Sequence, residues 1–169
     1  MNPIEALRAA FGARREPERL WVATTSPGER REMESFRGLD WTTLTCDHLV
    51  ENFSALFHFS PEAFAYFLPR ILAAGIREGR VDLLAYDVVV GDLDRSPRPD
   101  YWNESFADRW APLSREECRA VQSWLLWLME ADGEARFENT FDRAFDTLTL
   151  LGESSARERG GPRSDGTTS

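Results

Sequence analysis

The basic side chains of this sequence include no lysine, and acidic residues outnumber the basic ones. All 20 basic residues are arginines, against 29 aspartates and glutamates, so the formal net charge is -9. Nonspecific binding to nucleic acid depends on clustered cations that displace counterions from the phosphate backbone. We therefore expect that nucleic acid is not a partner.

Cysteine is scarce, and long apolar runs are missing. Cys46 and Cys118 cannot build a dense disulfide framework, and in a reducing compartment we expect both to be free thiols packed as small hydrophobic residues. The longest run of bulky apolar residues, WLLWLM at 124–129, is far shorter than the ~20 residues that span a bilayer. We expect no membrane association.

The first residues, MNPIEALRAAF, do not have the order of a cationic stretch, an apolar stretch and a small-residue cleavage site that marks a secretory signal. We therefore expect a cytoplasmic protein. Common catalytic and binding motifs are also missing: the sequence has no P-loop, no G-x-G-x-x-G, no H-E-x-x-H, no G-x-S-x-G and no EF-hand loop. We predict no catalytic residue and no cofactor, although an unusual enzyme is not excluded.

Helix signals are present along much of the chain. Asn2 and Pro3 are typical of a helix start, and Gly12 is a plausible end for that first helix. Ser114 and Glu117 form an S-x-x-E capping box ahead of a strong apolar stripe that ends near Asp132. A last helix, with apolar residues from 137 to 151, is expected to pair with its predecessor as an αα-hairpin.

The segment 60–76 predicts a buried amphipathic helix that contains a proline. Ser60 caps it, Pro61 occupies its first turn, and an apolar stripe continues to Gly75. Pro69 removes one backbone hydrogen bond, which costs ~3 kcal/mol in a helix interior. We expect Pro69 to bend or interrupt the helix after Leu68. The bend could serve the architecture, or it could free the Ala65 carbonyl for a ligand.

Three regions give weaker signals. Residues 14–40 suggest a loop followed by a short helix, with 20–22 extended. The stretch FRGLDWTTLTCDHLVENFSALFHF predicts a second helical segment, which places Leu49, Phe53, Leu56 and Phe57 on one side. Residues 82–93 could be helix or strand, and helix is favoured. From Glu153 onward the chain has almost no apolar content and is typical of a disordered tail.

These patterns predict a mainly α-helical fold. We expect one compact domain over residues 1–152, with about six or seven helices in an orthogonal, non-bundle packing, and a disordered C-terminal tail over residues 153–169. A chain of 169 residues is long enough for one substantial core.

Two motifs give the chain a family resemblance. Phe36-x-Gly38-x-x-Trp41-x-x-Leu44 is followed by Ser60-Pro61-Glu62-Ala63-Phe64-Ala65-Tyr66-Phe67-Leu68-Pro69, then by Trp102 and the capped helix from Ser114. Over roughly residues 32–130 the chain resembles a family of bacterial domains of unknown function. The resemblance implies no activity, but it implies that a proline at the position of Pro69 is a regular feature of this helix in the family and serves its architecture.

A metal site can be imagined around the two histidines. Cys46, Asp47, His48 and His58 are all donor types that zinc uses. The spacing fits no usual ligand pair, since ten residues separate His48 from His58, and packing among Phe57 and Phe59 explains His58 equally well. We predict no metal, and we keep an enzyme site around His48 and His58 as an alternative.

The loop DRSPRPDYWNESFADRW, residues 94–110, is the strongest surface candidate. Its prolines limit the entropy of the loop, and aromatic side chains are frequent anchors in protein interfaces. We therefore predict partner binding by Tyr101, Trp102, Phe106 and Trp110. The alternative is that these rings cover the core.

The size, the acidic charge and the lack of catalytic motifs together favour a binding protein. We expect a small acidic cytoplasmic protein that binds another protein as an inhibitor, immunity or accessory module. The alternative is a hydrolase or metal-dependent enzyme that uses His48 and His58. The partner, the substrate and the oligomeric state stay open at this point.

Overall fold

The chain folds almost entirely into α-helices. The computed structural model describes residues 2–132, 137 and 140–160, and omits the side chains of 157–160. Within these residues there are nine α-helices and one 3-10 helix: α1 Pro3–Phe11, α2 Pro27–Glu34, α3 Cys46–Glu51, α4 Ala55–His58, α5 Pro61–Glu78, α6 Leu84–Leu93, η1 Pro99–Tyr101, α7 Glu104–Trp110, α8 Arg115–Asp132 and α9 Phe141–Gly160. The expected mainly helical fold is confirmed.

The structure has more helices than the expected six or seven, and one predicted segment is divided. The second helical segment splits into α3 and α4, and Asn52 ends α3 in a non-helical conformation. Residues 82–93 are helical as favoured, since α6 covers Leu84–Leu93. No helix in the described part of the chain is both long enough and apolar enough to cross a bilayer. Orthogonal packing stays a prediction.

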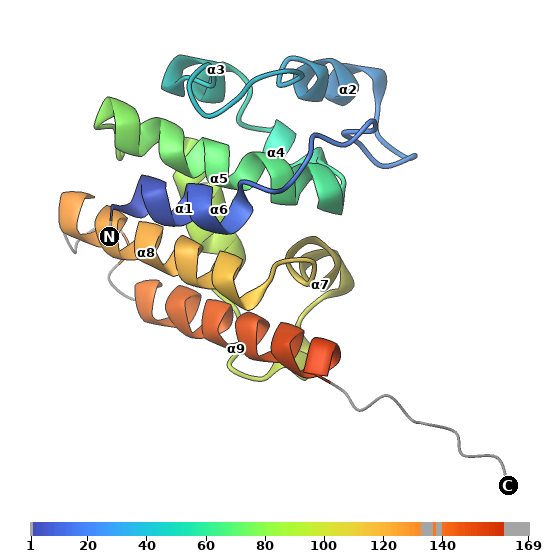
Figure 1. The fold of residues 1–169 in the computed structure, drawn as a ribbon. Coiled ribbons are helices and arrows are strands. Elements are labelled where there is room, and N and C mark those ends of the chain that lie inside the picture. The colour runs from blue at the N-terminus through green and yellow to red at the C-terminus, as the bar shows by residue number, and fades with distance from the viewer. Residues whose placement is uncertain (1, 133–136, 138–139, 161–169) are drawn as a thin grey trace, which may run out of the picture.

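The helices form stacked rows around α5 (Figure 1). The α8–α9 pair runs antiparallel, which confirms the predicted αα-hairpin, and α1 lies between α8 and α5. On the other side of α5 lie the short helices α2, α3 and α4, while α7 packs against α5 and α6 contacts both α3 and α9. The central position of α5 explains why its residues from Ala63 to Gly75 are all buried.

The helix α5 continues through Pro69, so Pro69 does not interrupt it after Leu68, and the bend that was the other expectation stays a prediction. It runs unbroken from Pro61 to Glu78, and Gly79 ends it with a φ of 65° in the left-handed region. Two features offset the hydrogen bond that proline removes. The turns on both sides are buried in the core, and the Arg70 guanidinium donates to the Tyr66 carbonyl at 2.5 Å, which adds a bond in the same turn.

The segment between α1 and α2 is held in an extended path, as residues 20–22 predict. Trp21 forms an isolated antiparallel bridge with Phe59, and the Ser60 amide donates to the Leu20 carbonyl at 2.8 Å. Farther back, Arg14 reaches Glu117 on α8 with two hydrogen bonds, of 2.5 and 2.8 Å. This segment therefore ties α8 to the start of α5.

The C-terminal helix is longer than the sequence predicts. We expected disorder from residue 153, but α9 continues to Gly160, so the prediction is wrong for 153–160. Ser155 is buried there, and its hydroxyl donates to the Leu113 carbonyl at 2.7 Å. Gly152 packs closely on α8, since an added Cβ would lie 3.4 Å from the Arg115 side chain. Residues 161–169 of the predicted tail lie outside the described residues.

Candidate functional site

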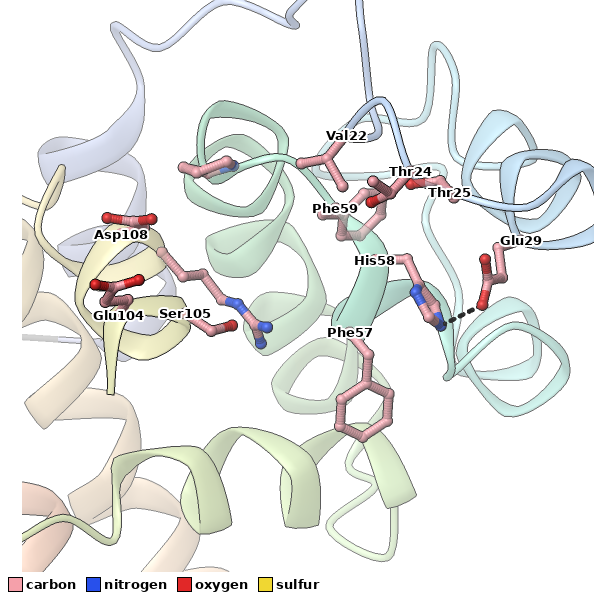
Figure 2. A pocket seen from close by; sticks show the side chains of 12 residues that line it. Val22, Thr24, Thr25, Glu29, Phe57, His58, Phe59, Glu104, Ser105 and Asp108 are labelled. Carbon is pink, nitrogen blue, oxygen red and sulfur yellow. Dashed lines mark ion pairs between the residues drawn. The ribbon is translucent and has the colours of Figure 1, made fainter. Parts of the chain in front are cut away.

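A pocket lies where α4 and α7 face each other, and we call it the α4–α7 pocket (Figure 2). Its volume is about 540 Å³. One side comes from the loop before α2, from α2 and from α4 with the residues that follow it: Val22, Thr24, Thr25, Glu29, Phe57, His58, Phe59 and Pro61. The other side comes from α7: Glu104, Ser105, Asp108 and Arg109.

The loop side of the pocket is fixed by hydrogen bonds. Arg30 on α2 donates to the Thr25 carbonyl at 2.9 Å, and its guanidinium lies 5.7 Å from the centre of the Trp21 ring. The Trp21–Phe59 bridge joins the same loop to the end of α4. The wall therefore has a defined position although it contains little regular structure. The Thr25 hydroxyl, on a residue only 6% exposed, has no hydrogen-bond partner.

A histidine and a glutamate contact each other in the pocket lining. His58 Nε2 lies 3.3 Å from Glu29 Oε1, and Figure 2 draws this pair between α4 and α2. Glu29 also completes a capping box with Ser26 at the start of α2. Hydrogen bonds from the Ser26 hydroxyl and amide lower the pKa of the Glu29 carboxyl below its ordinary value, so Glu29 is a carboxylate at neutral pH.

The α7 wall carries one arginine, which shares a carboxylate on α6 with a second arginine. Arg109 Nη1 lies 3.5 Å from Asp92 Oδ2, and the guanidinium sits 5.4 Å from the centre of the Phe64 ring. The same Asp92 oxygen accepts the Trp110 indole N–H at 2.7 Å, and its other oxygen pairs with Arg95. Asp92, which is not part of the pocket lining, therefore anchors α7 to α6 and shares its single charge between Arg95 and Arg109.

Two carboxylates on α7 are uncompensated. Glu104 and Asp108 are exposed and stand one helical turn apart on the pocket side. Within the described residues neither side chain has a hydrogen bond or an ion pair. Like charges at this spacing repel by ~0.2–0.5 kcal/mol. The pocket thus combines an unbalanced negative wall with the apolar side chains of Val22 and Phe57, which are 44% and 50% exposed.

The second histidine belongs to a different environment. His48 packs edge-on against Phe36, with ring centroids 4.5 Å apart, and its Nε2 lies 3.2 Å from the Ser35 hydroxyl oxygen. Burial lowers the pKa of His48. His58 lines the α4–α7 pocket and His48 does not. In the described part of the chain, no group of three or more His, Cys, Asp or Glu side chains could hold a metal ion.

Both cysteines are buried and free, as expected. Burial raises the pKa of Cys46 to about 12, and burial likewise raises the pKa of Cys118 to about 12. A thiol with such a pKa is protonated at neutral pH and is a poor nucleophile. These sites therefore act as small apolar residues.

The four aromatic residues predicted to bind a partner are placed very differently from one another. Tyr101 is 66% exposed, whereas Phe106 and Trp110 are 1% and 0% exposed. Trp102 is half-buried and donates its indole N–H to the Ser96 carbonyl at 2.8 Å. Phe106 and Trp110 therefore cover the core, which was the alternative for this loop. In this conformation only Tyr101 and the open edge of Trp102 can meet a partner.

Sequence reasoning missed most of the pocket. Phe57 was expected on the apolar side of its helix, yet half of it is exposed, because α4 is a separate short helix with its own orientation. A usable signal was the pair of acids four residues apart, Glu104 and Asp108, on a segment already expected to be helical. Nothing in the sequence indicated that α7 would face Val22 and His58.

No protein-family model, curated protein or solved structure matches this chain. The resemblance carried by residues 32–130 therefore stays a prediction. The function of the chain has to be inferred from the properties of the α4–α7 pocket itself.

Proposed function

We propose that this chain is a cytoplasmic protein-binding module of the inhibitor, immunity or accessory kind, and that it binds its partner at the α4–α7 pocket. The observation that carries the proposal is the combination of two half-exposed apolar side chains, Val22 and Phe57, with two unpaired carboxylates on the facing helix. Apolar surface covered by a partner contributes about 25 cal/mol per Å². An aromatic side chain in a concave site is a common anchor of protein interfaces.

The charge of the chain supports this role. A net charge of -9 repels acidic surfaces and steers basic partners toward the protein, which raises the rate of association. The three carboxylates that line the pocket, Glu29, Glu104 and Asp108, concentrate that charge at one place.

The second candidate function is a hydrolase or metal-dependent enzyme around the histidines. One observation favours it: His58 lies in the pocket beside Glu29, at 3.3 Å, and a general base is commonly oriented by a carboxylate in this way. His48 would not take part directly, since it packs against Phe36 and lies outside the pocket lining. Elemental analysis that finds about one metal per chain, lost in His58→Ala, would favour this candidate over the binding module.

The experiment is a comparative capture from lysate of the source cells. Immobilised wild-type protein is compared with Phe57→Asp, which places a charge on the apolar wall, and with Leu126→Asp as the matched control on α8. The two sites are 50% and 46% exposed, so neither change should disturb folding. Captured proteins are identified by mass spectrometry and then tested as purified pairs by calorimetry.

We expect one partner that binds wild type and Leu126→Asp equally and is lost with Phe57→Asp. A partner that binds all three proteins alike would contradict the assignment of the pocket. A capture that yields no specific protein from any of them would contradict the binding function itself.

A further inference from the structure

We infer that the α4–α7 pocket receives an arginine side chain of the partner protein, with the guanidinium between the α7 carboxylates and the loop that carries Thr25. This inference rests on the proposed binding function and adds the chemistry of the group that is recognised. Three properties of the pocket support it: its charge, its unused hydrogen-bond acceptors and its aromatic wall.

The charge of the pocket lining favours a cationic ligand over an anionic one. The lining has three carboxylates, one arginine and one histidine, and the arginine shares Asp92, 3.5 Å away, with Arg95, so acidic side chains outnumber the arginine in the lining. Glu104 and Asp108 form no ion pair in the described structure. A cation placed between them relieves their mutual repulsion and gains two ion pairs, whereas an anion would add a third like charge.

Hydrogen-bond acceptors without a partner favour a ligand that carries several hydrogen-bond donors. The two carboxylates of α7 supply four acceptor oxygens that have no hydrogen-bond partner in the described structure. The Thr25 hydroxyl also has no partner, but its oxygen is buried beneath the pocket surface. A guanidinium carries five N–H donors in one plane and can serve acceptors on both sides of a pocket, whereas an ammonium carries three.

The apolar wall suits the remainder of an arginine side chain. Phe57 is half exposed on the α4 side of the pocket, and Val22 lies on the loop side. A guanidinium stacks on an aromatic face, and its methylene stem covers apolar surface. Figure 2 shows Phe57 and Val22 on the side of the pocket opposite Glu104 and Asp108. The volume of about 540 Å³ falls within the ~300–1,000 Å³ of typical ligand sites.

The direct test is a titration of the ¹⁵N-labelled full chain with N-acetyl-arginine amide, followed by amide chemical shifts. The control ligand is N-acetyl-citrulline amide, which has nearly the same shape but no charge, and the lysine analogue tests the geometry. We expect chemical-shift changes at residues 22–25, 57–59 and 104–109. Binding should require millimolar concentrations of the ligand, because a single side chain offers little contact area. Citrulline should bind at least tenfold more weakly, and lysine should lie between the two.

The matched variants are Glu104→Gln/Asp108→Asn and, as a control with the same change in net charge, Glu51→Gln/Glu130→Gln on α3 and α8. All four side chains are exposed, so folding should be retained. We expect the α7 variant to weaken arginine binding at least tenfold and the control to leave it unchanged. Equal binding of arginine and citrulline, equal loss in both variants, or no shifts at the pocket would overturn the inference.

The two proposals fail in different ways. If the partner is lost with Phe57→Asp but binds Glu104→Gln/Asp108→Asn as wild type does, the pocket is a protein-binding site and the arginine inference is wrong. If the partner also binds Phe57→Asp unchanged, the proposed function of the pocket is wrong.

Discussion

The Tyr86 hydroxyl donates a hydrogen bond to the Leu72 carbonyl at 2.8 Å, directly beside Gly75. This contact joins α6 to α5, and it exists only because Gly75 has no side chain. A Cβ on Gly75 would lie 2.0 Å from the Tyr86 hydroxyl oxygen and 2.7 Å from the Arg80 carbonyl oxygen. The missing side chain of Gly75 therefore leaves the space that the Tyr86 hydroxyl occupies.

The first prediction compares two helical glycines. Gly75→Ala should destabilise the protein by ~1–3 kcal/mol, because a new methyl group must displace Tyr86 and a carbonyl in a packed core. Gly91→Ala on α6, where a Cβ meets nothing within 4 Å, should be neutral or stabilise by up to ~1 kcal/mol. Urea unfolding of both variants measures the difference. Equal midpoints for the two would contradict the close contact.

The second prediction concerns pH. Burial against Phe36 lowers the pKa of His48 in the folded chain, so below pH ~6.5 the unfolded chain binds this proton more readily than the folded chain does. Stability should therefore fall as the pH drops from about 7.5 to about 5.5. We measure the urea midpoint at pH about 7.5 and at pH about 5.5. The decrease between the two should be smaller for His48→Gln than for wild type. His58 is present in both proteins, so its contribution cancels; an identical fall in the two would show that His48 is not the cause.

The third prediction separates the aromatic residues of the 94–110 loop. Trp110→Ala should cost ~3–5 kcal/mol, because the ring is fully buried and its N–H is bonded to Asp92 at 2.7 Å. Tyr101→Ala should change stability by less than ~0.5 kcal/mol, since the ring is 66% exposed. Thermal and urea unfolding give both values. A Tyr101 variant that is as unstable as the Trp110 variant would mean that the loop packs differently.

The fourth prediction tests the docking of the end of α9. Ser155→Ala should destabilise the protein by ~1 kcal/mol, because the buried hydroxyl bonds the Leu113 carbonyl ahead of α8 and its loss leaves that acceptor without this donor. The control is Ser154→Ala, whose exposed hydroxyl bonds only the Leu150 carbonyl of the same helix. In chemical denaturation, wild type and Ser154→Ala should have the same unfolding midpoint, and Ser155→Ala should have a lower one. The reverse order would show that α9 does not dock through Ser155.

The sequence by itself determined the local features whose causes lie within a few residues. The Asn2 cap, the Ser60 cap with Pro61, and the Ser114–Glu117 capping box all form as expected, because each depends on groups three residues apart or fewer. The apolar stripes in the sequences of α5 and α8 also predicted which faces of these helices are buried. Helical periodicity alone places those side chains on one face.

Tertiary structure decided the rest. Pro69 is accommodated without a break because the surrounding core compensates for its lost hydrogen bond, and α9 extends past residue 153 because Ser155 finds an acceptor 42 residues away. The α4–α7 pocket likewise joins Val22, Phe57 and Asp108, which are far apart along the chain. Periodicity shows which face of a helix is apolar, but the path of the loops between helices fixes which faces meet. That path depends on long-range contacts such as the Trp21–Phe59 bridge, which no local pattern specifies.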